Sequence, residues 1–271
     1  MVSIFDDRQK KKADFILKNK HAKLSSLVSS EIKDLAVVWC YYSGKIEGNT
    51  YTYVETEALL KDDITSEKKY EDAKMLKNLY NTFISEVEYI NKYKKQELID
   101  ERTLFRIHRS ISSELVSGEE SGMIRTRAVR ITGTEYVPPK DIQEIRITLN
   151  EILFNQELYS NPLEKAVYLH CNIARLQPFI DGNKRTSRMM ESIALMNADI
   201  IPVYSAKDAD ILHYRRGLLS FYETGNYSEY TDYFLNRQIK RINELSLSGE
   251  PTFDLSKNRV EESGYDLELK N

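Results

Sequence analysis

Apolar residues at helical spacing recur along most of this chain, and few residues interrupt them. The clearest case is the stretch from about residue 66 to residue 95, with the stripe Ala73, Leu76, Leu79, Tyr80, Phe83, Ile84, Val87 and Ile90. Residues three and four apart share one helix face, so such a stripe buries a helix against a core. With only 10 Gly and 6 Pro in 271 residues, the sequence predicts an all-α fold of long helices rather than a sandwich or barrel.

The same spacing predicts helices on both sides of this stretch. A weak amphipathic stripe covers about 7–24, and a stronger one covers about 29–47 and stops before Gly48-Asn49, a common C-terminal signal. Further helices are expected over about 54–60, 101–115, 141–153, 163–175, 208–222 and 228–245. A lone histidine, His108, falls on one of them, and we expect a structural role for it. Polar residues without clear periodicity follow Gly249.

Composition and charge exclude several classes of protein. The formal net charge of −3 gives no general reason to expect a nucleic-acid partner. The longest apolar run, Leu35–Tyr42, is too short for a membrane span, and the first residues lack the apolar region of a signal peptide. Cys40 and Cys171 lie in apolar runs, which indicates buried thiols. We expect a cytoplasmic protein without a membrane partner, and the sequence leaves a homo-oligomer open.

The stretch Leu176–Arg188 carries the residue types of a phosphate and metal site. It reads Leu-Gln-Pro-Phe-Ile-Asp-Gly-Asn-Lys-Arg-Thr-Ser-Arg and is followed by apolar residues at helical spacing. That order predicts a turn entering the N-terminus of a helix, where free N–H groups and the helix dipole favour an anion. The candidate residues are Asp181, Gly182, Asn183, Lys184, Arg185 and Arg188.

Each charged residue type suits this chemistry. Arg185 and Arg188, three apart, share a helix face, and each offers a planar fork of donors to phosphate oxygens. Asp181 is a hard oxygen ligand for a phosphate-bound Mg²⁺. The alternative is an ordinary Gly-Asn turn before a helix whose arginines form surface ion pairs.

The longer pattern resembles the signature of the Fic (Fido) domain family, His-x-Phe-x-(Asp/Glu)-Gly-Asn-x-Arg-x-x-Arg. Every named position matches except the first, where this chain has Gln177. A second departure is Lys184, where AMP-transferring members mostly carry Gly. The resemblance implies a mainly helical Fic fold and divides the chain into a helical region (1–100), a Fic core (101–247) and a polar tail (248–271).

A second stretch resembles a regulatory motif of the same family. Ser43-Gly-Lys-Ile-Glu47-Gly-Asn is similar to the inhibitory motif (Ser/Thr)-x-x-x-Glu-(Gly/Asn), here at the end of the expected helix over about 29–49. The resemblance implies that Glu47 pairs with Arg188 and blocks the seat of the ATP γ-phosphate. Without the resemblance, Ser43 and Glu47 are a polar helix end.

A Gly-containing turn between two short apolar runs, 127–131 and 135–137, predicts the one short β-hairpin. In the resemblance this hairpin is the flap that aligns a segment of the target protein by strand addition. The expected flap residues are Ile131, Thr132, Gly133, Thr134, Glu135 and Tyr136. Without the resemblance it is a surface hairpin of a helical protein.

The resemblance implies AMP transfer from ATP to a Ser, Thr or Tyr hydroxyl of a target protein, with ATP and Mg²⁺ bound. Asp181 would hold the Mg²⁺, residues 182–184 would form the anion hole, and the two arginines would bind phosphates. Gln177 stands at the position of the catalytic base, and its neutral amide cannot accept a proton there. Three alternatives therefore stay open: a catalytically degenerate nucleotide-binding regulator, a de-AMPylating variant and a phosphate-transferring variant.

Overall fold

The computed structural model describes residues 3–93, 96–205 and 207–261 of the chain. It is mainly helical, as the sequence predicts, with ten α-helices among these residues. The helices of the first half are α1 (Asp7–Lys18), α2 (Ser29–Ile46), α3 (Tyr53–Asp62), α4 (Tyr70–Tyr93) and α5 (Glu101–Ile111). Those of the second half are α6 (Ile142–Asn155), α7 (Pro162–Leu176), α8 (Asn183–Asn197), α9 (Asp208–Thr224) and α10 (Ser228–Leu245).

Side-chain caps mark the starts of α1, α3, α5, α6 and α7. The Asp6 side chain accepts from the Gln9 N–H at α1, and Thr52 accepts from Glu55 at α3. Asp100 caps α5 in the same way. Such caps satisfy backbone donors that have no partner within the helix. The three short 3-10 helices are η1 (Lys20–Ala22), η2 (Leu24–Ser26) and η3 (Gln156–Leu158).

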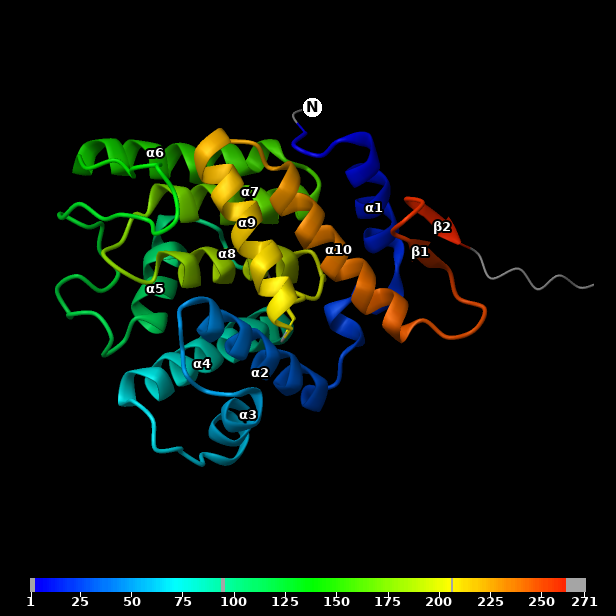
Figure 1. Ribbon diagram of the computed structural model, residues 1–271, viewed down its shortest axis with the longest axis horizontal. Helices are drawn as coiled ribbons and strands as arrows, with labels where there is room; N and C mark the ends of the chain where they lie inside the picture. The colour runs from blue at the N-terminus through cyan, green and yellow to red at the C-terminus, as the bar shows by residue number, and fades with distance from the viewer. Residues whose placement is uncertain (1–2, 94–95, 206, 262–271) are drawn as a thin grey trace, which may run out of the picture.

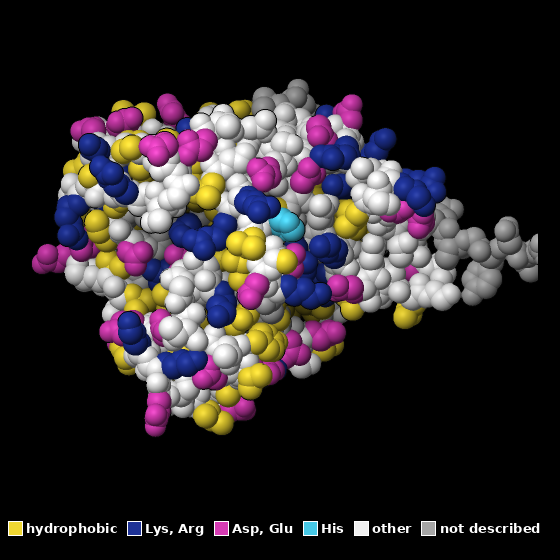
Figure 2. Space-filling model, in the orientation of Figure 1, with side chains coloured by type: hydrophobic (Ala, Val, Ile, Leu, Met, Phe, Trp, Pro, Cys, Tyr) yellow, Lys and Arg dark blue, Asp and Glu magenta, His cyan; other side chains and the backbone are white. Residues whose placement is uncertain are grey.

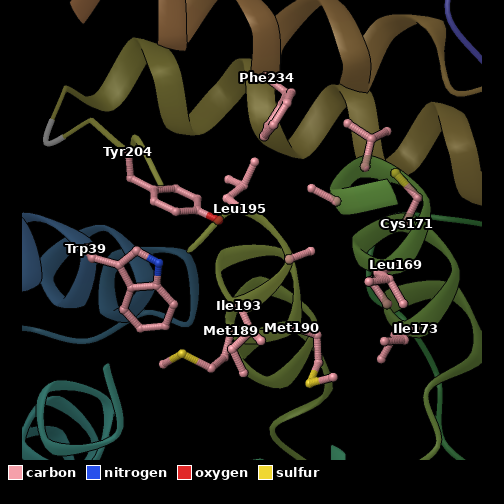
Figure 3. Packing of buried hydrophobic residues seen from close by; sticks show 14 of the residues in the cluster. Trp39, Leu169, Cys171, Ile173, Met189, Met190, Ile193, Leu195, Tyr204 and Phe234 are labelled. Atoms are coloured by element: carbon pink, nitrogen blue, oxygen red, sulfur yellow. The ribbon is translucent and has the colours of Figure 1, made fainter. Parts of the chain in front are cut away.

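Helix α8 lies at the centre of the core. Its side chains Met189, Met190 and Ile193 lie between Trp39 of α2 and the apolar face of α7 (Figure 3). Nearly every residue of α8 is buried, including both of its arginines. Helices α4 and α5 contact it from one side, and α7 packs beside it along its length (Figure 1). A helix buried all round places whatever precedes its N-terminus in a fixed position.

Helices α9 and α10 pack closely against each other and cover α7 (Figure 1). A Cβ added at Gly217 of α9 would lie 2.7 Å from the Cα of Tyr230 in α10, so only glycine permits this approach. Helix α1 packs along α10. The buried, free thiols of Cys40 and Cys171 confirm the expectation from their apolar surroundings. No helix among the described residues is both long and apolar enough to cross a membrane.

The single hairpin lies elsewhere than predicted. Between 125 and 140, all of them described, no strand forms, so the prediction of a hairpin at 127–137 is wrong. The observed strands, β1 (Thr252–Asp254) and β2 (Arg259–Glu261), pair antiparallel within the segment predicted as a polar tail. Phe253 anchors them: it is buried against Phe15 of α1 at 5.4 Å between ring centroids. The rest of that predicted tail, 262–271, lies outside the described residues.

Lysine and arginine side chains are interspersed with aspartate and glutamate side chains over the face of the molecule shown in Figure 2.

Candidate functional site

The turn between α7 and α8 (residues 177–182, the α7–α8 turn) is closed by its own residues. Gln177 ends α7 in the left-handed region with φ 52°, and Gly182 has φ 74° just before α8. The Asn183 side chain accepts from the Phe179 N–H and donates to the Phe179 carbonyl, both at 2.8 Å. These two bonds satisfy buried backbone groups that would otherwise lack partners. The predicted turn into a helix N-terminus is present.

His108 of α5 supports this turn from below. Its ring stacks on Phe179 with centroids 3.8 Å apart, and its Nε2 lies 3.0 Å from the carbonyl oxygen of Asp181. The Gly122 N–H donates to Nδ1 at 2.8 Å, so the proton sits on Nε2 and is donated to Asp181. Burial, which outweighs the hydrogen bond to Asp181, lowers the pKa of His108 to about 4. His108 thus has a structural role, as the sequence predicts, and what it stabilises is the α7–α8 turn of the candidate site.

Arg185 presents unused donors at the N-terminus of α8. Its side chain is only 3% exposed, and Nη2 donates to Asp181 Oδ2 at 2.8 Å. Its Nε and Nη1 are buried and have no hydrogen-bond partner among the described residues. Buried guanidinium donors are rarely left unpaired, so these two point to a missing anion. The first backbone N–H groups of α8 add donors in the same place, since a helix cannot satisfy its own first turn.

Arg188, one turn further along α8, is completely buried, and its donors are engaged. Nε donates to Ser43 Oγ at 3.2 Å, and Nη2 donates to the Ser43 carbonyl at 3.3 Å and to Glu47 Oε1 at 3.0 Å. Nη1 donates to the Tyr214 hydroxyl at 3.1 Å. The structure therefore brings Arg188 together with Ser43 and Glu47, although Arg188 follows them by more than 140 residues in sequence.

Glu47 follows the last residue of α2 and lies beside Arg188 and Lys184 of the candidate site. Its side chain is 17% exposed, and its second oxygen lies 3.5 Å from Lys184 Nζ. Burial alone would raise the pKa of Glu47, but Arg188, Lys184 and Arg185 outweigh it and hold the pKa below its usual value. Glu47 is therefore an anion seated among the cations of the site. It occupies the charge environment that a phosphate group would need.

Asp181 is the residue that fits a metal. Its side chain is 64% exposed, and one of its oxygens already binds Arg185. Within the described part of the chain, no three His, Cys, Asp or Glu side chains gather to hold a metal ion by themselves. Mg²⁺ commonly takes one or two protein carboxylates and completes its shell with substrate phosphates and water. Asp181, a single exposed carboxylate beside a candidate phosphate site, fits this way of binding Mg²⁺.

Gln177 faces back toward its own helix. Its side-chain amide donates to the Ala174 carbonyl at 2.6 Å, and the residue is 8% exposed. Its backbone carbonyl accepts from Arg125 Nε at 2.7 Å. An amide nitrogen bound to a carbonyl has no basic lone pair, so the geometry gives Gln177 an orienting capacity and no proton-accepting one.

The loop between α5 and α6 (residues 112–141, the α5–α6 loop) carries the predicted flap residues and is tied to the turn by Arg125. Besides its bond to Gln177, Arg125 donates to the carbonyls of Arg127 at 3.0 Å and Pro139 at 2.5 Å. The backbone N–H of Arg125 donates to the Pro178 carbonyl. The base of the loop therefore lies beside Gln177.

The far part of the α5–α6 loop is held by α9 and α7. The Glu223 carboxylate accepts from the Thr134 hydroxyl and from the Glu135 N–H at 2.8 Å. The Arg175 guanidinium lies over the Tyr136 ring, 4.3 Å from its centroid. Of the other predicted flap residues, Ile131 packs against the core, and Thr132 and Gly133 form an exposed turn.

Sequence reasoning missed Arg125, Tyr214 and Glu223. Arg125 sits in an irregular stretch, and its partners are carbonyl groups, which no residue pattern reveals. Tyr214 is one of 18 tyrosines on a helix of ordinary composition. Glu223 is an exposed residue at a helix end. A helical projection of α9 would place Tyr214 and Gly217 on the buried side, which is the one signal available.

Comparison with known sequences accounts for this arrangement. Residues 98–195 match the model of the Fic/DOC family. The chain contains a Fic/DOC family domain. The matched range contains α5, the α5–α6 loop, the α7–α8 turn and most of α8. Helix α2 and its Glu47 lie outside it.

The related proteins bear the name protein adenylyltransferase Fic. Protein adenylyltransferase Fic of Drosophila persimilis is 29% identical over 179 residues, which cover 64% of this chain and 34% of that protein. Its counterpart in Culex quinquefasciatus is 29% identical over 207 residues, covering 74% and 40%. This chain thus spans between a third and two fifths of the length of these relatives.

Solved structures share the fold at lower identity. A Fic family protein from Desulfovibrio desulfuricans superposes with a TM-score of 0.72 at 18% identity, covering 89% of this chain and 74% of that one. A Fic-1 fragment from C. elegans gives 0.66 at 19% identity, covering 87% and 68%. These likenesses establish a common fold across most of the chain.

Proposed function

We propose that this protein is a Fic-type protein adenylyltransferase that transfers AMP from ATP to a Ser, Thr or Tyr hydroxyl of a target protein. Glu47 holds the ATP site closed, and Gln177 weakens turnover. The observation that carries the proposal is Arg185, which keeps two buried guanidinium donors without a partner at the N-terminus of α8. The related adenylyltransferases support the reaction type.

In this proposal the triphosphate lies across the start of α8. The backbone N–H groups of residues 182–184 and the free donors of Arg185 bind the inner phosphates. The Asn183 side chain is committed to Phe179, so Asn183 contributes its backbone N–H and the shape of the turn. Asp181 holds Mg²⁺, which neutralises phosphate charge when bound. Most of the catalytic effect in such a site comes from positioning and charge stabilisation.

Glu47 competes with the γ-phosphate. Its carboxylate occupies Arg188 Nη2 and approaches Lys184, the two cations nearest to it. The γ-phosphate brings more charge and more acceptor oxygens than the carboxylate, but to displace Glu47 it must break a buried ion pair. Breaking a buried ion pair usually costs more free energy than breaking an exposed one. The end of α2 is therefore an autoinhibitory element in this proposal.

In this proposal Gln177 limits the rate of AMP transfer. General-base catalysis is worth roughly 10²–10⁴-fold, and an amide cannot supply it. His170 offers no replacement, because it is fully buried and hydrogen-bonded to Tyr214. We expect nucleotide binding to survive and transfer to be slow.

The test uses ATP labelled at the α-phosphate, a cell lysate as the source of targets, and four proteins: the parent chain, Glu47→Gly, Gln177→His and the double variant. We expect protein label to rise for each single variant and to be strongest in the double variant. Arg185→Ala in the double background should remove it. ATP labelled only at the γ-phosphate separates AMP transfer from phosphate transfer.

Absence of label and of ATP binding in the double variant would reject the proposal. ATP binding without label in the double variant would instead favour the second candidate, a nucleotide-binding regulator. The inward-turned amide of Gln177 is the observation that keeps that candidate in view. Loss of AMP from a pre-labelled target in the presence of the parent chain would identify the de-AMPylating variant.

A further inference from the structure

A buried polar network extends from Nη1 of Arg188, whereas Glu47 binds Nη2. Tyr214 of α9 binds Arg188 Nη1 through its hydroxyl, and the same hydroxyl lies 3.0 Å from Nε2 of His170 in α7. On the other side of the His170 ring, Nδ1 lies 3.2 Å from Glu191 Oε2 in a bent contact. Three helices, α7, α8 and α9, thus meet around one continuous chain of polar groups.

The far end of the network is a carboxylate saturated with donors. Glu191 is 1% exposed and accepts from the Tyr204 hydroxyl at 2.5 Å on one oxygen. The Tyr230 hydroxyl donates to the other oxygen at 2.6 Å. Acceptance at both oxygens is the pattern of an ionised carboxylate. Tyr230 also stacks on the His170 ring, 4.9 Å between centroids, which fixes the plane of the imidazole.

The direction of each bond in the network follows from the donor inventory. Arg188 has no acceptor, so the Tyr214 oxygen accepts from it. The carboxylate of Glu191 faces Nδ1 of His170, which places the imidazole proton on Nδ1 and leaves Nε2 as an acceptor. The Tyr214 hydroxyl therefore donates to His170. Burial lowers the pKa of His170 and keeps the ring neutral, as this arrangement requires.

The network gives Arg188 a second source of negative charge. Arg188 is fully buried, and a buried cation without a counter-charge costs several kcal/mol. Glu47 supplies that charge from the solvent side but is only the partly exposed end of a helix. Glu191 lies three residues after Arg188 on the same helix face, and Tyr214 and His170 connect it to the guanidinium. This second charge is present whether or not Glu47 is engaged.

We propose that Tyr214 is a positioning residue for Arg188: backed by His170 and Glu191, it holds the guanidinium at the phosphate site after Glu47 has left. This inference rests on the proposed function, because it concerns how Arg188 is kept ready for a γ-phosphate. Glu47 then controls access to Arg188, and Tyr214 controls its orientation. When the autoinhibitory contact with Glu47 breaks, Arg188 is therefore already oriented toward the phosphate site.

The chain offers a matched control on the same helix. Tyr222 is as buried as Tyr214, and its hydroxyl has no hydrogen-bond partner among the described residues. Tyr214→Phe removes a hydroxyl that binds Arg188, and Tyr222→Phe removes one that lies in electrostatic range of Arg188 but makes no hydrogen bond among the described residues. Both substitutions keep the ring and its packing. Both are made in the Glu47→Gly background, where Arg188 keeps Tyr214 at Nη1 and Ser43 at Nε and Nη2.

The first measurement is calorimetric binding of ATP and of AMP. With Tyr214→Phe we expect ATP affinity to fall about tenfold, the effect of losing one charge-assisted hydrogen bond. AMP, which has no γ-phosphate to reach Arg188, should bind as before. Tyr222→Phe should leave both affinities unchanged. Equal losses for ATP and AMP, or an ATP loss of less than twofold, would overturn the proposal.

The second measurement needs no nucleotide. Nitrogen-15 NMR of labelled arginine, with the Arg188 guanidinium signal assigned by its loss in Arg188→Lys, reports whether that group is held. We expect a sharp, slowly exchanging signal in Glu47→Gly and in Glu47→Gly/Tyr222→Phe, and loss of it in Glu47→Gly/Tyr214→Phe. Persistence in the last variant would overturn the positioning role. If Glu47→Gly binds no ATP yet shows the expected NMR pattern, the proposed function fails while Tyr214 is shown to hold Arg188.

Discussion

The α7–α8 turn and the α5–α6 loop lie side by side, yet different contacts hold them. The turn is held from within: Asn183 binds both backbone groups of Phe179, and two left-handed residues shape its ends. The loop is held partly by its own Arg125, which binds two of its carbonyls, and partly by Glu223 of α9, which binds its far part. The turn is mostly buried, whereas much of the loop is exposed.

From this difference we expect the α7–α8 turn to keep one conformation and the α5–α6 loop to be able to adjust its conformation. A turn closed by its own buried bonds presents the proposed phosphate-binding groups in one geometry, which suits a charge-stabilising site. A loop tethered by a few side chains can shift when a protein segment docks beside it. Substitutions in the turn should therefore change stability and nucleotide binding together. Substitutions at the outer tether of the loop should change neither.

The largest expected effect is that of Asn183→Ala. It leaves the buried N–H and carbonyl of Phe179 without partners, which costs about 2–4 kcal/mol of unfolding free energy. Asn243→Ala is the matched control, since Asn243 binds both backbone groups of Phe253 in the same way at the β1–β2 hairpin. Urea denaturation should show a loss for both variants. Only Asn183→Ala should lose ATP binding, and equal binding by both would break the comparison.

The next effect is a pH dependence centred on His108. Its pKa of about 4 in the folded protein lies below the ordinary value of 6.5, so the unfolded chain binds more protons between these pH values. Stability should therefore fall as pH drops from about 6.5 to about 4, by roughly 2–3 kcal/mol from this residue. His170, whose pKa is also lowered by burial, adds a change of the same sign.

Denaturation of His108→Gln across the same pH range isolates the contribution of His108. The variant should lose part of the pH dependence, because glutamine does not titrate. A curve parallel to that of the parent would show that the protonation of His108 is not linked to folding.

Gly182→Ala should cost about 1–2 kcal/mol, because φ 74° forces an alanine into the left-handed region. Gly225, with φ 72° at the end of α9, is the matched control, since the backbone strain is the same and no atom lies near its Cβ position. Thermal denaturation should rank the two variants as similar. ATP affinity should fall only for Gly182→Ala, and an equal fall for Gly225→Ala would contradict a local effect.

The smallest effect on stability is expected for Glu223→Ala. The carboxylate is exposed, so Tm should stay unchanged, while trypsin should cleave the α5–α6 loop faster at Arg127 or Arg130. The bonds from Thr134 and Glu135 lower the pKa of Glu223, so the tether should persist as pH falls through the usual glutamate range and be lost at lower pH. Glu229→Ala, on the neighbouring helix, serves as the control. Unchanged cleavage would show that Glu223 does not hold the loop.

The two regions also differ in how far the sequence predicts them. The α7–α8 turn follows from local signals: a proline, a Gly-Asn pair and a helical stripe follow one another between Pro178 and Met196. The α5–α6 loop does not, because Val129, Ile131, Tyr136 and Val137 satisfy a strand pattern without a ladder to join. Arg125 takes the carbonyl of Arg127, which lies in the first predicted strand of that hairpin.

Long-range partners explain the remaining differences. The β1–β2 hairpin forms where the sequence is polar, because Phe253 packs on Phe15 and Asn243 brackets its backbone. The Tyr214–His170–Glu191 network joins three helices through residues that no short motif contains. The contact between Glu47 and Arg188 was reached from the sequence through family resemblance, since composition and spacing alone do not pair residues so far apart.

The central claim is that Glu47 and the γ-phosphate of ATP compete for Arg188. Calorimetric titration of ATP and AMP into the parent chain and into Glu47→Gly, both with Mg²⁺, tests it most directly. We predict that Glu47→Gly binds ATP at least about tenfold more tightly than the parent chain, the effect of one charged contact, while AMP affinity is the same for both. Equal ATP affinities, or an equal gain for AMP, would contradict the claim.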